Sequence, residues 1–388
     1  MFIAILILVL LAVAWCREQA VLYASETCAE IKVRKEYRDM TAQEWNDYLR
    51  AMRLVEPELG RWTRIHLENV SQAHGVAGFF PWHRLFVIAW EERLRELVPG
   101  VTVPYWDWSA DWADPLSASL FQLIPVRPGP NGDCRYMRDV PNRHCLMRNY
   151  TAANFTTFYS TRTINRVMNE SQRFEDLWRI LEPAPHGIVH AAFGGVGGDM
   201  AAMHSPNDPL FWFHHSNMDR MWAEWQDKDP RRLSDYSGQT VGNRRVRLSD
   251  IMDPFNVTAA DAVDYRRFCY QYQPYSGNNI NQTRISRQGA GSRLQAAEGM
   301  LPAPLPMDFV MMHGLDEEEL RKQEEHMRQV MKQELVETSA SADGETSTTS
   351  NNKNTNSDKK QSSASKKSID KNFTLLFALL LALFCYYL

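Results

Sequence analysis

The distribution of histidine restricts this chain more than any other feature of its sequence. Two segments, roughly 62–112 and 178–225, are rich in histidine and tryptophan, and an irregular Pro/Gly/Asn-rich stretch of about 109–160 separates them. These segments contain the histidines His66, His74, His83, His186, His190 and His215. His186 and His190 stand at i and i+4, one helical turn apart on one face. Two groups of three histidines, each split over two helices, would converge in the core of a helical bundle.

His83 illustrates why these histidines need to be considered together. It stands within GFFPWHRLFVIAW, residues 78–90, among five Phe and Trp side chains. A lone histidine in such a setting is more often structural than a ligand. Imidazole is, however, a good ligand for copper, zinc, iron and nickel. No cysteine or carboxylate stands at matching spacing, which argues against an iron centre with two histidines and one carboxylate. Three histidines per ion, with no anionic ligand, would leave a pair of ions highly charged and favour an anion or reduced dioxygen between them. Two metals ~3.5–4 Å apart can bind one such small ligand jointly.

Helical patterns dominate the rest of the sequence. Thr41 is a predicted N-cap and Glu44 completes its capping box. Residues 81–98 form a predicted helix, with Arg84 and Glu91 largely away from its apolar face. That apolar face consists of His83, Val87, Trp90, Leu94 and Leu97. Because β-branched alternation is scarce, we predict a mainly α fold with an antiparallel four-helix bundle core and long irregular loops.

Four motifs, in family order, resemble those of the tyrosinases. HG…FFPWHRLF at 74–86 and HSPNDPLFWFHHSNMDRMWAEW at 204–225 resemble the two copper-binding signatures, and PYWDW at 104–108 and HGIVHAAFGG at 186–195 also fit. The resemblance covers roughly residues 40–230. It implies two copper ions, with O2 as co-substrate, enclosed by the bundle. By this resemblance, copper A is held by His66, His74 and His83, and copper B by His186, His190 and His215.

The resemblance also has consequences for neighbouring residues. It assigns the ligand role to His215, so that His214 either points away or acts outside the ligand set. We expect Arg84 to form a salt bridge with Asp219. His204 is interpreted as a loop histidine. The residues Trp106, Asp107 and Trp108 are interpreted as packing and capping residues.

Two positions depart from the family pattern. Many members have a cysteine, cross-linked to the second copper A histidine, where this chain has Gln72. Phenol-hydroxylating members often have asparagine directly after the first copper B histidine, where this chain has Gly187. Glu182 is the candidate for the nearby glutamate that positions a water as base, although its gap to His186 is short. These departures weaken the case for phenol hydroxylation more than that for catechol oxidation, and Gly187 would also widen the entrance.

The ends of the chain differ from its middle. Residues 1–20 contain an apolar run typical of a secretory signal peptide, and 373–388 form an uncharged apolar tail, typical of a GPI signal or a short transmembrane anchor. Residues 338–372 are rich in Ser, Asn and Lys and are expected to be a disordered stalk. Residues 21–315 would then form the copper domain, and 316–337 a charged helical segment. We expect a secretory-pathway protein, extracellular or at the cell surface, held at the membrane by its C-terminal tail.

Cysteines and sequons fit that expectation. Cys28, Cys134, Cys145 and Cys269 are an even set for an oxidising compartment. Cys134 could pair with Cys145 across a short loop, leaving Cys28 and Cys269 to join the ends of the domain, but sequence alone does not fix the connectivity. Sequons predict glycans at some of Asn69, Asn149, Asn154, Asn169, Asn256 and Asn281. The net charge of −4, with both signs mixed, gives no indication of nucleic-acid binding.

The resemblance implies a copper oxidase that hydroxylates phenols at the ortho position, oxidises catechols to o-quinones, or does both. Such chemistry serves pigment formation or cross-linking of an extracellular coat. The alternatives are a catechol oxidase without monophenolase activity and haemocyanin-like O2 binding without turnover. Phenolic or catecholic small molecules and protein tyrosine side chains are all candidate substrates, and the oligomeric state does not follow from the sequence. The segment PMDFVMMHG, residues 306–314, could cover the entrance.

Overall fold

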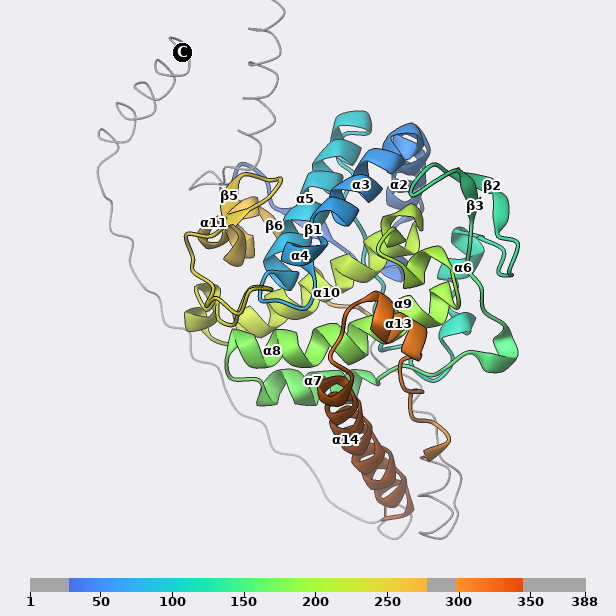
Figure 1. The fold of residues 1–388 in the computed structure, drawn as a ribbon, viewed down its shortest axis with the longest axis vertical. Coiled ribbons are helices and arrows are strands. Elements are labelled where there is room, and N and C mark those ends of the chain that lie inside the picture. Colours follow the sequence, from blue (N-terminus) through green and yellow to red (C-terminus); the bar gives the residue numbers. More distant parts are fainter. Residues whose placement is uncertain (1–27, 278–297, 345–388) are drawn as a thin grey trace, which may run out of the picture. The chain divides into compact units, whose positions relative to one another are not determined.

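The protein is built mainly from helices, as predicted (Figure 1). The computed structural model describes residues 28–277 and 298–344. The helices in these ranges are α2 (Ala42–Val55), α3 (Leu59–Glu68), α4 (Val70–Ala73), α5 (Phe79–Leu97), α6 (Leu120–Leu123), α7 (Thr161–Glu170), α8 (Phe174–Leu181), α9 (Gly187–Gly194), α10 (Leu210–Asp227), α11 (Ala259–Val263), α13 (Met307–Met312) and α14 (Glu317–Gly344). Thr41 caps α2 through the predicted capping box with Glu44, which confirms that expectation.

The core is organised around α5 and α10, which pack against each other, with α3 and α9 also carrying histidines of the two groups. Every side chain of α5 from Phe79 to Ile88 is buried, and nearly every side chain of α10 is buried as well. Trp90 of α5 stacks on Trp212 of α10 with ring centroids 4.0 Å apart, and Trp62 of α3 meets both rings edge-on. Pro81 lies in the first turn of α5, where its missing N–H leaves no helical hydrogen bond unmade.

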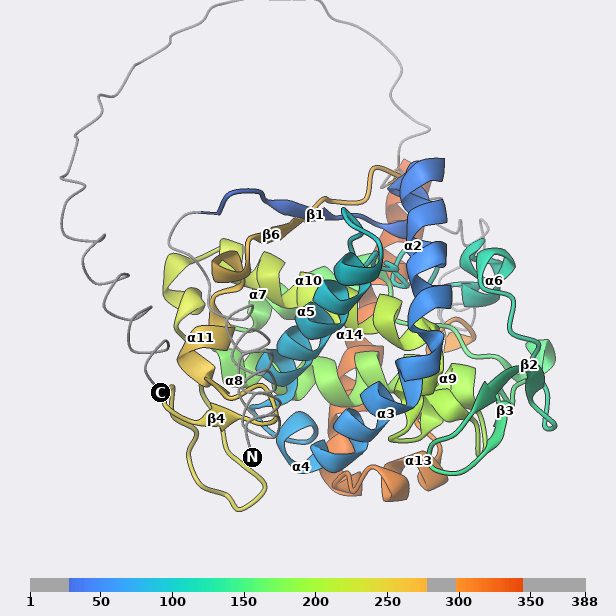
Figure 2. The same ribbon diagram turned by 90° about the horizontal axis from the view of Figure 1, so that it is seen from above.

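Three small two-stranded sheets lie around this helical core. Their strands are β1 (Lys32–Arg34) with β6 (Tyr270–Tyr272), β2 (Asp133–Arg138) with β3 (His144–Leu146), and β4 (Ile251–Met252) with β5 (Val257–Thr258). The β1–β6 pair is parallel and joins the beginning of the described chain to a segment more than two hundred residues later (Figure 2). Disulfides join Cys28 to Cys269 and Cys134 to Cys145, so the pairing considered from the sequence is confirmed.

Arg84 and Glu91, which were expected away from the apolar face of α5, are both fully buried. The β1–β6 pair supplies charged and hydroxyl partners for these side chains. Arg34 of β1 donates to Glu91 at 2.8 Å, and Arg84 donates to Asp219 of α10 at 2.6 Å. Tyr270 of β6 donates its hydroxyl to the other oxygen of Asp219, also at 2.6 Å. The predicted Arg84–Asp219 salt bridge is therefore confirmed, as one part of a buried network.

The C-terminal part of the described chain contains α13 and α14. The charged segment predicted at 316–337 is helical, and α14 continues beyond it to Gly344. The remainder of the predicted stalk, the predicted signal peptide and the predicted apolar tail lie outside the described residues. Among the helices that the structure describes, none has the length and hydropathy required to span a bilayer.

Two of the predicted glycosylation sites have their amide nitrogen engaged. Nδ2 of Asn69 donates to the Ile65 carbonyl at 2.8 Å, and Nδ2 of Asn149 donates to the Val196 carbonyl at 2.7 Å. A glycan is attached at this nitrogen, so glycosylation would alter both contacts. Asn169, by contrast, is exposed.

Candidate metal centre

Three histidines from the first half of the chain converge beneath the start of α5. His66 comes from α3, His83 from α5, and His74 from the turn between α4 and α5. The Nδ1 atom of His66 lies 2.7 Å from the Met203 carbonyl, and that of His83 lies 2.8 Å from the Phe79 carbonyl. A carbonyl only accepts, so Nδ1 carries the proton and Nε2 keeps its lone pair. The Nε2 atoms of His66 and His74 are 3.0 Å apart.

The second group forms in the same way around α9. His186 ends a π-helical turn, Glu182–His186, that contains Pro185 and joins α8 to α9. Its Nδ1 donates to the Glu182 carbonyl at 2.9 Å, and Nδ1 of His190 donates to the Met200 carbonyl at 2.7 Å. π-Helical turns are rare and concentrate at functional sites. The turn therefore sets the direction of His186 relative to His190, one turn further along.

The two groups face each other across a short distance. The rings of His83 and His215 are nearly parallel, with centroids 4.2 Å apart. His74 and His186 also approach across the same space, with centroids 6.1 Å apart. Phe79 contacts the rings of His74, His83, His186 and His215, and it is fully buried. Aromatic side chains therefore exclude water from the space between the two groups.

The imidazoles in this centre are neutral at ordinary pH. Burial lowers the pKa of His66 to about 4 and that of His190 to about 3. Burial also lowers the pKa of His74, His83 and His215 well below the usual value, and neighbouring histidines add to the effect. Neutral imidazoles present lone pairs, which is the form that binds a metal ion.

The donor set fits two metal ions. One nitrogen from each of His66, His74 and His83 lies within 4.8 Å of the others, and the same holds for His186, His190, His214 and His215. Among the described residues, the buried Nε2 atoms of His83 and His186 have no hydrogen-bond partner. Buried polar nitrogens without partners are costly, and a bound cation would satisfy them. All six histidines predicted from the sequence are thus brought together.

His214 does not point away from the centre. Its ring stacks on that of His186, with centroids 5.1 Å apart, and is 4.9 Å from that of His190. His215 occupies a different position, because its Nε2 is 3.3 Å from Nε2 of His190 and its ring stacks on His83 of the other group. His215 therefore lies between the two groups, and His214 lies beside His186 and His190 of the second group.

Glu182 contacts the first group although it belongs to the π-helical turn of the second. One carboxylate oxygen accepts from the Gly75 N–H at 2.8 Å and lies 3.4 Å from Nδ1 of His74. Burial raises the pKa of Glu182 to about 8. Gly75 has φ of +67°, a conformation that favours glycine. Gln72, which replaces the cross-linking cysteine, directs its side chain to Asp253.

The space beside Gly187 is filled, contrary to the expectation of a wider entrance. A Cβ atom built at Gly187 would lie 3.1 Å from Cδ1 of Leu305 and 3.5 Å from Cε1 of Phe309. Both side chains are buried. They belong to residues 301–314, which we call the C-terminal strap. The absence of a side chain at Gly187 thus lets the strap approach the start of α9.

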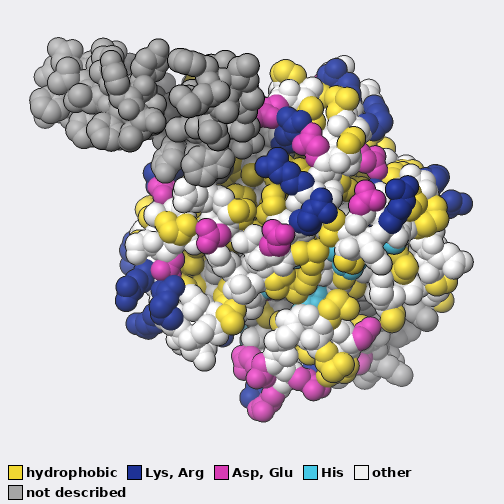
Figure 3. Space-filling view, turned by 45° about the horizontal axis from the view of Figure 1, so that its top comes forward, with side chains coloured by type: hydrophobic (Ala, Val, Ile, Leu, Met, Phe, Trp, Pro, Cys, Tyr) yellow, Lys and Arg dark blue, Asp and Glu magenta, His cyan; other side chains and the backbone are white. Residues whose placement is uncertain are grey.

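The C-terminal strap is held next to the histidines by its own polar contact. Nε2 of His313 lies 2.9 Å from the Ala201 carbonyl, and the ring of Phe309 stacks on His313 at 3.8 Å. The centroid of His313 is 6.4 Å from that of His74. Histidine side chains are visible among hydrophobic ones on the face shown in Figure 3. The sequence motif around His313 pointed to this segment, but nothing in it indicated the Ala201 partner.

A helical core with two facing histidine groups defines a candidate binuclear metal centre. The family model "Common central domain of tyrosinase" matches residues 56–135 and 121–228. Tyrosinase from Streptomyces glaucescens is 32% identical over 219 residues, covering 50% of this chain and 77% of that protein. The chain therefore belongs to the tyrosinase family, and its cofactor is a pair of copper ions.

Solved structures share the fold. A polyphenol oxidase from Thermothelomyces thermophila superposes with a TM-score of 0.51 at 22% identity, covering 63% of this chain and 89% of that one. Deoxygenated hemocyanin from Rapana thomasiana gives a TM-score of 0.50 at 21% identity, covering 66% and 72%. At these identities the likeness concerns the fold alone.

Proposed function

We propose that this protein is a copper oxidase that converts catechols to o-quinones with O2. The observation that carries the proposal is the convergence of two facing groups of buried, neutral histidines in a chain of the tyrosinase family. Two catechols each give up two electrons and two protons, and one O2 accepts them to give two waters. The copper pair would supply the electron exchange with O2.

We assign copper A to His66, His74 and His83, and copper B to His186, His190 and His215. The choice of His215 over His214 is supported by its position, because a pair that shares one small ligand requires ligands on the facing sides. Backbone carbonyls fix the direction of four of these imidazoles, namely His66, His83, His186 and His190. Such outer contacts hold ligand geometry and tune affinity.

Glu182 would have two roles at the site. One oxygen holds Gly75 and faces His74, and the other is buried with no hydrogen-bond partner among the described residues. When Glu182 is ionised, that second oxygen would hold a water able to take a proton from the substrate hydroxyl. Gly187 offers no side-chain amide to hold the same water. We therefore propose that catechol oxidation exceeds phenol hydroxylation.

Oxygen binding without turnover is a second candidate function, and one observation favours it. The C-terminal strap packs against Gly187 and places Phe309 and His313 beside the histidines. A covered centre admits O2 more readily than an aromatic substrate. The protein would then be at rest with the strap docked and active with the strap open.

The deciding experiment measures O2 consumption and quinone formation by the copper-loaded full chain, with a catechol and the matching monophenol side by side. We expect catechol turnover at least tenfold faster than phenol turnover. Equal rates would contradict the role given to Gly187. Reversible O2 binding with no quinone, even after removal of the strap, would support the carrier function and contradict the oxidase.

We also propose that the protein works in the secretory pathway or outside the cell, attached to the membrane by its C-terminal tail. The two disulfides support an oxidising compartment. In that setting, catecholic small molecules or tyrosine side chains of a coat protein would be its substrates, for pigment formation or cross-linking. Cell fractionation with and without a phospholipase that cleaves GPI anchors tests the attachment, and recovery in the cytosol would contradict it.

A further inference from the structure

A second cluster of metal-ligating side chains lies outside the copper centre. His144 comes from β3, and Asp199 and His204 come from the loop that precedes α10. Nε2 of His144 is 2.9 Å from Oδ1 of Asp199, and Nε2 of His204 is 3.7 Å from the same oxygen. Two donors bound at ~2.1 Å to a tetrahedral zinc ion lie roughly 3.4 Å apart. The three side chains are therefore spaced for one shared ion.

Both ring nitrogens of His144 face oxygen atoms, which a neutral imidazole cannot satisfy. Its Nδ1 lies 2.7 Å from the Asn142 carbonyl, and its Nε2 faces the Asp199 carboxylate. Both of these oxygens only accept, whereas a neutral imidazole has one N–H. Nε2 therefore needs either a second proton or a metal ion. The Asn142 contact holds the ring in the tautomer that offers Nε2 as a ligand.

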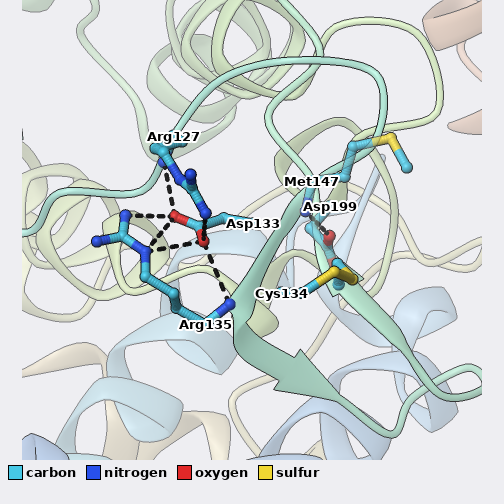
Figure 4. Close-up of a disulfide and its surroundings, with 7 residues drawn as sticks. Arg127, Asp133, Cys134, Arg135, Met147 and Asp199 are labelled. Atoms are coloured by element: carbon cyan, nitrogen blue, oxygen red, sulfur yellow. Dashed lines mark hydrogen bonds and ion pairs between the residues drawn. A yellow bond between two sulfur atoms is a disulfide. The ribbon is translucent and has the colours of Figure 1, made fainter.

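Asp199 is a buried carboxylate with fixed geometry. Its Oδ2 accepts from the Met147 N–H at 2.7 Å, a contact drawn in Figure 4, and its Oδ1 accepts from the Asn207 side chain at 2.8 Å. Within the described part of the chain, its ion-pair partners are His144 and His204, with no lysine or arginine. A buried negative charge of this kind is costly unless a cation compensates it.

The cluster is open to solvent on one side. The side chains of His144 and His204 are 22% and 21% exposed. An ion can therefore enter and keep water as its remaining ligand. The disulfide from Cys145 to Cys134 fixes the backbone next to His144, so the β3 side of the cluster is held in place.

The same loop also positions ligands of both coppers. The Met200 carbonyl accepts from Nδ1 of His190, and the Met203 carbonyl accepts from Nδ1 of His66. Asp199 and His204 are the residues directly before and after this pair of carbonyls. An ion bound to the cluster would tie both ends of the loop to β3.

We propose that His144, Asp199 and His204 form a third metal site for a divalent first-row ion, with zinc as the fitting example. Two imidazoles and one carboxylate suit such ions, and the partial exposure of the two histidines leaves room for water. The ion would restrain the loop that orients His66 and His190. Binding of this ion does not depend on the proposed oxidase function. Only its effect on the orientation of the copper ligands rests on the proposed function.

Metal analysis of the copper-loaded full chain tests the site. After equilibration with Zn²⁺ and removal of free metal, we expect two coppers and one zinc per chain. The variants His204→Ala and His144→Asn should lose the zinc and keep both coppers. Retained copper shows that each variant is folded. His326→Ala, which removes an exposed histidine of α14, should keep all three ions. Failure of the wild type to retain zinc, or retention by both cluster variants, would overturn the site.

Hydrogen exchange tests the proposed restraint without relying on activity. Zinc should slow exchange of the amides of residues 199–204 in the wild type and leave His204→Ala unchanged. Cobalt added to the wild type in place of zinc should give visible absorption that zinc then removes. Zinc binding without slower exchange would overturn the restraint, and a lack of cobalt absorption would count against the donor set.

Discussion

Replacing Phe309 by alanine should open the copper centre. Phe309 is 4% exposed and lies between Gly187 and His313 in the docked strap. Removal of a buried phenylalanine side chain costs about 3–5 kcal/mol where the surroundings do not collapse. Taking the lower value, about 3 kcal/mol shifts the ratio of docked to undocked strap by roughly 100-fold, since ~1.4 kcal/mol is one factor of ten.

The assay is kcat/KM for a catechol, measured on the copper-loaded wild type and on Phe309→Ala. We expect a rise of at least tenfold, because substrate reaches the centre only when the strap is undocked. Met311→Ala is the matched control, since this residue of α13 is 72% exposed and should change nothing. Limited proteolysis reports undocking independently. If Phe309→Ala makes the strap cleavable while kcat/KM stays at the wild-type value, the strap does not control access.

Three further predictions follow from the contacts around the centre. Arg84→Met should lower the free energy of unfolding, measured in urea, by about 3–5 kcal/mol, because Asp219 stays buried and loses a partner. Arg231→Met, at an exposed position, should leave the free energy of unfolding nearly unchanged, and similar losses in both variants would refute the network. Glu182→Ala should weaken copper retention roughly 10- to 100-fold. Glu182→Gln should weaken it less, because its amide oxygen can still accept from the Gly75 N–H. Equal copper affinity in the wild type and both variants would contradict a role for this hydrogen bond. Gly187→Asn should undock the strap, because the new Cβ would crowd Leu305, and faster proteolysis of the strap would report it. Unchanged cleavage would show that the strap adjusts to the side chain and stays docked.

Local patterns predicted the helices and the histidines well. The capping box at Thr41, the long helix that carries His83 and the i,i+4 pair of His186 and His190 depend on residues close in sequence, so the pattern contains the necessary information. The Cys134–Cys145 pairing is similarly local.

Contacts between distant segments could not be obtained in the same way. The burial of Arg84 and Glu91 did not follow from their own helix, because nothing in it shows that β1 and β6 supply partners there. The carbonyls of Met200 and Met203 orient ligands, yet a backbone group has no residue-type signature. Of the two alternatives for His214, the ring contacts with His186 and His190 exclude that it points away, whereas its place outside the ligand set stays a prediction.

Copper content is the most direct test of the central claim that two histidine groups each hold one copper ion. We predict two coppers per chain for the wild type, one for His215→Ala and two, more weakly held, for His214→Ala. His83→Ala should likewise retain one copper, at the other site. A wild type that binds fewer than two coppers would contradict the account, and loss of a copper in His214→Ala but not in His215→Ala would overturn the ligand assignment.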